Sequence, residues 1–145
     1  MIPVAELYPE HAEDERRNGH FYGPSNYGPL LESFGYEILV QVDDADYQGD
    51  SRLLYKNGDQ YGILVFGWGS CSGCDALQDC DHMSEIEELQ RSLYEGIHWG
   101  TAEEILAYID DKDWQGSASW YAGKEELPQF IAEVRQHLGG GNEPV

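Results

Sequence analysis

The dipeptide Asn57-Gly58 constrains the fold more than any other feature of this sequence. Asn-Gly is the strongest short signal for a two-residue β-hairpin, because both turn positions need positive φ. It separates two apolar segments, residues 51–56 and 60–68, which we therefore expect to be antiparallel neighbours. An earlier segment, from residue 36, has Ile38, Val40 and Val42 at every second position, as a strand with one better-buried face has. The sequence predicts a three-stranded antiparallel meander over about residues 36–68.

Helices are expected in the C-terminal half. Ser84 with Glu87, and Thr101 with Glu104, have the spacing of a capping box. An apolar stripe at helical spacing follows each box, and a further helix is expected over about residues 125–138. The stripe residues are Ile86, Leu89, Leu93 and Ile97 after the first box, and Ile105, Leu106 and Ile109 after the second. The predicted fold class is α+β, with the meander packed against these C-terminal helices.

Residues 4–17 predict an N-terminal helix with few apolar positions, lying on the surface and ended by Gly19. We expect a single domain over residues 1–138 and, from Gly139, a flexible C-terminal tail over residues 139–145. The sequence contains no apolar run of about 18 residues, and its first residues do not resemble a secretion signal. The sequence therefore predicts a cytoplasmic protein without a membrane-spanning segment.

Charge is the most unusual feature of the composition. Twenty-eight acidic residues against eight basic residues give a formal net charge of −20 over 145 residues. Such a chain repels nucleic acid and anionic membranes, and it attracts basic protein surfaces. Solubility alone is one explanation of this charge, and binding of a basic partner is the other.

Three groups of carboxylates are the candidate partner-binding residues. The first group lies in a predicted loop, and the other two lie on predicted helix surfaces. They are Asp43, Asp44, Asp46 and Asp50; Glu85, Glu87 and Glu88; and Asp110, Asp111 and Asp113. The loop resembles the start of a calcium-binding loop, but Tyr55 stands where such a loop needs a bidentate Glu, so an acidic β-turn is expected instead.

The cysteines cluster directly after the third predicted strand. Cys71, Cys74, Cys80 and His82 follow the spacing C-x2-C-x5-C-x-H and could hold one structural zinc ion. A second interpretation is a reactive thiol at the start of a helix, as in Cys-x-x-Cys redox proteins, although the predicted antiparallel neighbours do not fit that fold. A third is that the cysteines only pack at a strand-to-helix crossing and bind no cofactor.

Residues 67–77, with the sequence GWGSCSGCDAL, follow the segment YGILVF. This motif resembles a set of small uncharacterised proteins of phage and actinobacterial type, and the resemblance extends over about residues 46–113. It implies no known activity and no catalytic residue. It favours an accessory protein of phage type, which would act in the cytoplasm of a host cell.

The sequence thus predicts a non-enzymatic acidic protein that binds a basic, nucleic-acid-binding protein. Such a protein would act as a nucleic-acid mimic of phage type and would inhibit its partner. Direct binding of nucleic acid or membrane is not expected. One alternative is a zinc-stabilised or thiol-redox domain centred on the cysteine cluster. Another is a structural or assembly protein whose interface is formed by the aromatic residues Trp99, Trp114, Trp120 and Tyr121.

Overall fold

The computed structural model describes residues 1–45, 49–69, 75–111 and 125–139. The chain divides into two compact units, each made of two segments. The helical unit consists of Met1–Gly35 and Trp68–Gly96, and the sheet unit consists of Tyr36–Gly67 and Ile97–Val145. The expectation of one domain over residues 1–138 stays a prediction. The predicted tail lies outside the described residues except for Gly139, which ends the last helix with a φ of 77°.

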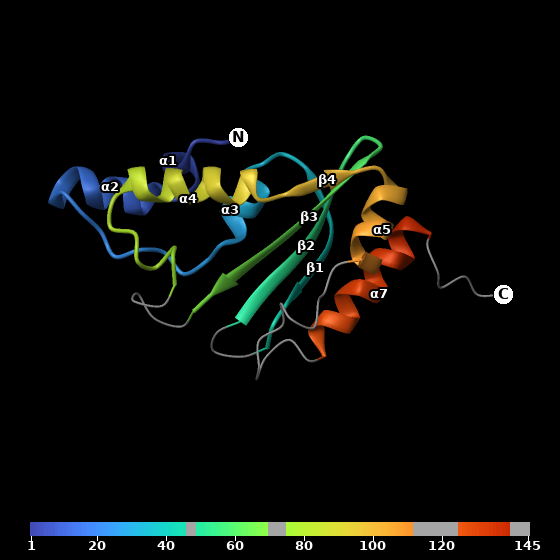
Figure 1. Ribbon diagram of the computed structural model, residues 1–145. Helices are drawn as coiled ribbons and strands as arrows, with labels where there is room; N and C mark the ends of the chain where they lie inside the picture. The colour runs from blue at the N-terminus through green and yellow to red at the C-terminus, as the bar shows by residue number, and fades with distance from the viewer. Residues whose placement is uncertain (46–48, 70–74, 112–124, 140–145) are drawn as a thin grey trace. The chain divides into compact units, whose positions relative to one another are not determined.

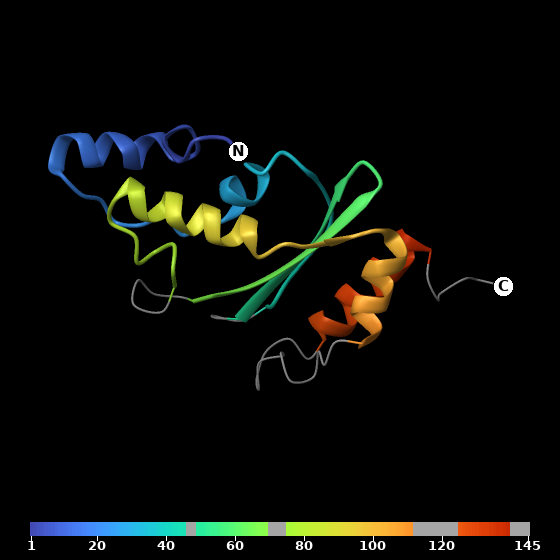
Figure 2. The ribbon, with the colours of Figure 1, turned by 45° about the horizontal axis from the view of Figure 1, so that its top comes forward.

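Four helices form the helical unit. They are α1 (Val4–Leu7), α2 (Pro9–Asn18), α3 (Gly28–Glu32) and α4 (Met83–Glu95). α4 contacts α1 and α2 (Figures 1 and 2). The core comes from both segments, with the buried side chains Val4, Tyr8, Phe21, Leu30, Leu31, Phe34, Leu77, Cys80, Ile86 and Leu93.

The N-terminal segment is more deeply integrated than a single surface helix. Pro9 opens α2 and separates it from α1, and Tyr8 between them is buried. α2 itself has no buried residue, so the predicted surface helix is confirmed for α2, as is its end at Gly19 in the left-handed region. Gln90 of α4 donates hydrogen bonds from Nε2 to the carbonyl oxygen of Ile2 and to Ser33 Oγ, both at 2.9 Å. The start of the chain is thereby tied to α4.

The sheet unit contains a four-stranded antiparallel sheet in the order β1-β2-β3-β4. Its strands are β1 (Glu37–Asp43), β2 (Gly49–Asn57), β3 (Gln60–Trp68) and β4 (His98–Gly100). Helices α5 (Ala102–Asp111) and α7 (Glu126–Leu138) lie side by side against the sheet (Figures 1 and 2). Strands and helices share one apolar core, made of Val40, Val42, Leu54, Ile63, Ile105, Ile109, Leu127, Phe130 and Val134. The α+β class and the antiparallel sheet are confirmed. Of the three predicted C-terminal helices, α5 and α7 pack on the sheet, whereas α4 belongs to the helical unit.

The predicted strand count of three is wrong because β4 adds a fourth strand. α4 ends at Gly96, so Ile97 does not belong to the helical stripe in which it was predicted. His98–Gly100 instead pairs with β3, with Trp99 opposite Gly62. A Cβ on Gly62 would lie closer than 3.0 Å to Trp99 and Ile97, so only glycine leaves room for them there.

Two predicted local motifs are shifted. The hairpin between β2 and β3 is confirmed, but its two loop residues are Gly58 and Asp59, and only Gly58 has positive φ, at 64°. The first capping box is wrong, because α4 starts before Ser84 and it is Glu85 that accepts the N–H of Asp81 and of His82. The second box is confirmed: Glu104 Oε1 accepts the Thr101 N–H at 2.8 Å, and Thr101 Oγ1 accepts the Glu104 N–H at 3.2 Å.

Asp44 is buried in the sheet unit, which corrects its expected position on the surface. The antiparallel register places Val42 opposite Arg52, so Asp44 lies next to this arginine. Arg52 Nη1 lies 2.7 Å from Asp44 Oδ1, and both side chains are at most 2% exposed. Asp44 Oδ2 also accepts the Asp50 N–H at 2.8 Å, and Asp50 Oδ2 lies 3.5 Å from Arg52 Nη2. The Asp44 carboxylate therefore joins the residue after β1 to Asp50 and Arg52 of β2.

We predict that Asp44→Ala lowers the free energy of unfolding by about 3–5 kcal/mol, because it leaves the buried Arg52 charge without its main partner. The neighbouring Asp43 is exposed and bonds only to Gln41 among the contacts described, so Asp43→Ala should change stability by about 0.5 kcal/mol or less. Urea denaturation of both variants measures the difference. Equal stability of the two variants would contradict the structural role of the buried pair.

Candidate functional site

A buried carboxylate organises the start of the region in which the candidate site was expected. Asp75 is 3% exposed, and its carboxylate accepts three hydrogen bonds from described residues. Its Oδ1 accepts the Gly69 N–H at 2.8 Å and the Tyr27 hydroxyl at 3.2 Å, and its Oδ2 accepts the Gln78 N–H at 3.0 Å. The Gln78 side chain returns a hydrogen bond to the Gly69 carbonyl oxygen at 3.1 Å. Asp75 thus ties Gly69, the turn after residue 75 and the Tyr27 segment together.

Tyr27 connects this centre to the N-terminal segment. Its hydroxyl also accepts the N–H of Leu77 at 3.3 Å. Burial and the neighbouring Asp75 carboxylate raise the pKa of Tyr27 well above its usual range, although the Leu77 hydrogen bond opposes the shift. The phenol therefore stays protonated and acts as a donor to Asp75.

Cys80 is a buried thiol in a negative environment. Cys80 is 6% exposed, and its Sγ donates a hydrogen bond to the Ala76 carbonyl oxygen at 3.3 Å. Burial raises the pKa of Cys80 to about 11, and the negative charges of Glu85, Asp79, Asp81 and Asp75 add to the shift. A thiol with this pKa is protonated at neutral pH, and the thiol form is neither a nucleophile nor a metal ligand.

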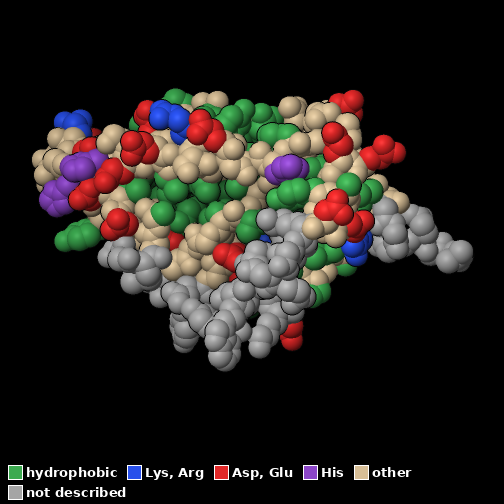
Figure 3. Space-filling view, viewed as in Figure 1, with side chains coloured by type: hydrophobic (Ala, Val, Ile, Leu, Met, Phe, Trp, Pro, Cys, Tyr) green, Lys and Arg blue, Asp and Glu red, His purple; other side chains and the backbone are tan. Residues whose placement is uncertain are grey.

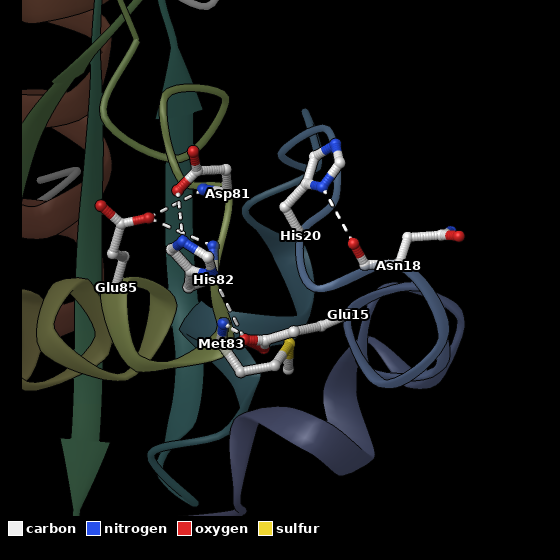
Figure 4. Close-up of polar contacts among 7 residues, drawn as sticks. All are labelled: Glu15, Asn18, His20, Asp81, His82, Met83 and Glu85. Atoms are coloured by element: carbon white, nitrogen blue, oxygen red, sulfur yellow. Dashed lines mark hydrogen bonds and ion pairs between the residues drawn. The ribbon is translucent and has the colours of Figure 1, made fainter.

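His82 faces carboxylates through both ring nitrogens (Figure 4). Nδ1 lies 3.4 Å from Glu15 Oε2 of α2, and Nε2 lies 3.5 Å from Asp81 Oδ1. Glu15 also accepts the Met83 N–H at 2.8 Å, so it holds the first residue of α4. The cluster therefore docks α2 against the start of α4, and His20, drawn beside it, contacts the Asn18 carbonyl oxygen instead.

The zinc hypothesis stays a prediction. Cys71 and Cys74 lie outside the described residues, and only Cys80 and His82 of the four candidate ligands are described. Within the described ranges, no three His, Cys, Asp or Glu side chains are placed to hold a metal ion. A zinc site would have to be completed by residues beyond those ranges.

An acidic hollow lies along α4, next to Cys80. It has a volume of about 340 Å³. Its carboxylates come from Asp79, Glu85 and Glu88, and the remaining lining consists of Ala76, Cys80, Leu89 and Ser92. The described lining of the hollow thus combines a partly apolar surface with three carboxylates and contains no basic residue.

Neighbouring carboxyl groups interact at the start of this hollow. Asp81 and Glu85 are close enough for a hydrogen bond between their side chains, which raises the pKa of Asp81. Glu85 accepts the backbone N–H of Asp81 and of His82, and these bonds hold the pKa of Glu85 below its usual value. Glu85 therefore remains ionised and is fixed in place, while Asp81 is the carboxyl group that takes up a proton more readily.

The remaining candidate carboxylates are divided. Glu85, Glu87 and Glu88 are exposed on α4, as expected, and Figure 3 shows carboxylates over α2 and α4 as well as over α5. Asp43, Asp110 and Asp111 are exposed in the sheet unit, where Asp110 pairs with Arg135 of α7 at 2.6 Å. Asp50 is half-buried beside Arg52. Asp46 and Asp113 lie outside the described residues.

The arginines do little to offset this surface charge because their guanidinium groups lie next to carboxylates. Arg16 and Arg17 contact Glu13, Arg91 lies 3.9 Å from Glu87, and the other two described pairs involve Arg52 and Arg135. The lining of the acidic hollow contains none of them. The negative field around Cys80 is therefore not cancelled locally.

Comparisons with protein-family models, with curated proteins and with solved structures gave no match. The resemblance of residues 67–77 to phage and actinobacterial proteins therefore stays a prediction. In the part of the chain that the structure describes, no helix is both long enough and apolar enough to cross a membrane.

Sequence reasoning missed Asp75 and Arg52 as buried charges and Asp79 as part of a hollow. Arg52 carried a signal, because a charged residue inside an apolar strand must find a partner, and the register of β1 with β2 leads to Asp44. The sequence signal for Asp79 was weaker: this residue belongs to a run of acidic residues before α4. Nothing in the sequence pairs Asp75 with Tyr27, which is 48 positions away.

We predict that Cys80 alkylates slowly at pH 8 and that its rate rises towards a midpoint near the pKa of about 11. The measurement uses iodoacetamide on a Cys71→Ser, Cys74→Ser variant, so that only Cys80 reacts. Adding Asp79→Asn should lower the midpoint, because one of the nearby negative charges is removed. A midpoint below pH 9 would contradict the described environment of this thiol.

Proposed function

We propose that this protein binds a basic, nucleic-acid-binding protein through its carboxylates and competes with nucleic acid for that partner. The observation that carries the proposal is the acidic hollow on α4, where Asp79, Glu85 and Glu88 surround a partly apolar surface. Lysine and arginine side chains have the matching character: an apolar stem and a cationic end. The hollow is therefore suited to a cationic side chain of the partner.

Three features of the site support this assignment. The Glu85 carboxylate is held by two backbone N–H groups, so it is positioned before a partner arrives. Burial is the main cause of the raised pKa of Cys80, and the negative charges of the surrounding carboxylates add to it. The net charge of −20 adds long-range attraction for a cationic protein and repulsion of nucleic acid.

Competition with nucleic acid follows from the same chemistry. A protein surface that binds phosphates presents lysine and arginine side chains, and these also bind carboxylates. A dense set of carboxylates can therefore occupy a nucleic-acid-binding surface without base recognition. The role of an inhibitor of phage type rests further on the resemblance of residues 67–77. We propose no enzymatic activity.

The alternative is a zinc-stabilised or thiol-active domain. The observation in its favour is that Asp75 and Gln78 hold Gly69, directly before the segment that contains Cys71 and Cys74. Metal analysis of protein purified without chelator distinguishes the two proposals. About one zinc ion per chain would support the structural metal site, and a thiol that reacts rapidly at neutral pH would support a thiol-redox function.

We predict that the partner is captured from host lysate at low salt and released by about 0.5 M salt, because the association depends on charge. Added DNA or RNA should release it as well. The variant Asp79→Asn, Glu88→Gln should bind the captured partner about tenfold more weakly, from the loss of two ion pairs. Titration of the purified partner, followed by calorimetry, measures the change.

The control is Glu6→Gln, Glu32→Gln, which removes the same number of exposed carboxylates outside the acidic hollow. If both variants weaken binding equally, net charge rather than the hollow determines affinity. If the captured protein binds no nucleic acid, or if nucleic acid does not displace it, the proposed function is wrong.

A further inference from the structure

Tyr22 is the most exposed large hydrophobic residue in the part of the chain that the structure describes. It lies between α2 and α3 in the helical unit and is 91% exposed. Amphipathic side chains at a surface generally bury the apolar body and leave only the polar end in water. A whole tyrosine ring in solvent is instead a feature of protein interfaces, where tyrosine is enriched among the residues that contribute most to binding.

The backbone on both sides of Tyr22 is held in place, so its exposure does not come from a loose loop. Phe21 is 4% exposed, and its N–H donates to the Asp81 carbonyl oxygen at 3.0 Å. On the other side, a Cβ on Gly23 would lie within 3.0 Å of three carbonyl oxygens of the turn before α4. Only the two side-chain torsions of Tyr22 remain to be ordered when a partner binds, which keeps the entropic cost of binding low.

The turn to which the Tyr22 segment is tied is acidic. It contains Asp79 and Asp81, and both residues are exposed. His20 precedes the segment and is also exposed, but its Nδ1 lies 3.3 Å from the Asn18 carbonyl oxygen, so the ring is directed to the end of α2 (Figure 4). The two arginines of α2 lie next to a carboxylate of their own helix.

An aromatic ring beside carboxylates selects a cationic, planar group. An apolar surface of a partner would cover the carboxylates without a counter-charge, which costs free energy. A nucleobase would stack on the ring, but the phosphates that accompany it are repelled by this acidic protein. A guanidinium group meets both requirements, because it stacks on an aromatic face and keeps N–H groups at its edge for a carboxylate. An ammonium group is a point charge without such a plane.

Tyr22 and the acidic hollow are separate contact points on one turn. Asp79 and Cys80 line the hollow, whereas Tyr22 and Asp81 do not. The carbonyl oxygens of the same turn contact the segment that presents Tyr22. A partner that places one cationic side chain in the hollow can therefore bring a second one to Tyr22.

We propose that Tyr22 stacks on an arginine side chain of the basic partner, and that the guanidinium group of this arginine pairs with Asp81. This inference rests on the proposed function. It adds a contact point outside the acidic hollow and names arginine as the residue type that is recognised there.

The first test is NMR titration of the full chain, with ¹³C-labelled tyrosine rings, against N-acetyl-arginine methylamide. At pH 8 imidazole groups are ordinarily uncharged, so His20 and His82 do not compete for Asp81. The Tyr22 resonance is assigned from its loss in Tyr22→Leu. It should shift saturably with the arginine probe and at least about threefold less with the lysine analogue or the uncharged citrulline analogue. No shift, or an equal shift with either analogue, would overturn the proposal.

Matched variants separate Tyr22 from the acidic hollow, because the same probe can also enter the hollow. Binding in the hollow is followed at the backbone amides of Leu89 and Ser92, which line it. Asp81→Asn should reduce the shift of the Tyr22 ring about threefold or more, whereas Glu88→Gln should reduce only the shifts at the hollow. Equal effects of the two variants on the Tyr22 ring would overturn the proposal.

The second test uses the captured partner. Tyr22→Leu should weaken its binding about fivefold or more, because leucine keeps an apolar surface but has no aromatic face. Tyr22→Phe keeps the ring and should stay within about twofold of the unchanged protein. Unchanged binding by Tyr22→Leu would overturn the proposal. Circular dichroism confirms that each variant is folded.

The outcomes separate this inference from the proposed function. If nucleic acid displaces the captured partner but Tyr22→Leu binds it normally, the Tyr22 contact fails alone. If the arginine probe shifts the Tyr22 ring with the expected dependence on Asp81, but nucleic acid does not displace the partner, the proposed function fails and Tyr22 remains an arginine-binding position.

Discussion

The hydrogen bonds of one buried carboxylate hold the turn that lines the acidic hollow against the segment before α3. Asp75 joins Tyr27, Gly69 and Gln78, which come from three separate parts of the sequence. The segment before α3 is thereby held against the turn that carries Asp79 and Cys80. That turn lines the acidic hollow through Ala76, Asp79 and Cys80. A buried carboxylate is stable only when donors surround it, so the three partners and the position of the turn depend on one another.

The charges of this protein fall into two classes with different roles. Asp44, Asp75 and Arg52 are buried and fully engaged, so they shape the backbone and contribute nothing to the surface. The carboxylates along α4 and around Cys80 are exposed, and each arginine of the chain lies next to a carboxylate elsewhere or on α4. Counting acids in the sequence does not separate these classes. Asp43 and Asp44 are adjacent in sequence, yet the first faces solvent and the second faces Arg52.

The sequence predicted the elements whose signals are local. Alternation gave β1, the Asn57-Gly58 turn gave the hairpin, and the Thr101 capping box gave the start of α5. It failed where a distant partner decides the structure. His98–Gly100 becomes a strand because Gly62 of β3 leaves room for Trp99. Asp44 is buried because the register of β1 with β2 brings Arg52 beside it. The sequence shows the run of acidic residues before α4, but it does not predict the acidic hollow. The shape of the hollow depends on the backbone conformation of residues 75–81.

The central claim is that negative potential is concentrated at the acidic hollow rather than spread evenly over the surface. Paramagnetic relaxation of amide protons by a cationic and an anionic nitroxide, compared residue by residue, measures this potential directly. The account predicts the largest excess of relaxation by the cationic probe at residues 79–88, and a smaller excess there in the Asp79→Asn, Glu88→Gln variant. An equal ratio of the two probes at all exposed amides of the described chain would contradict it.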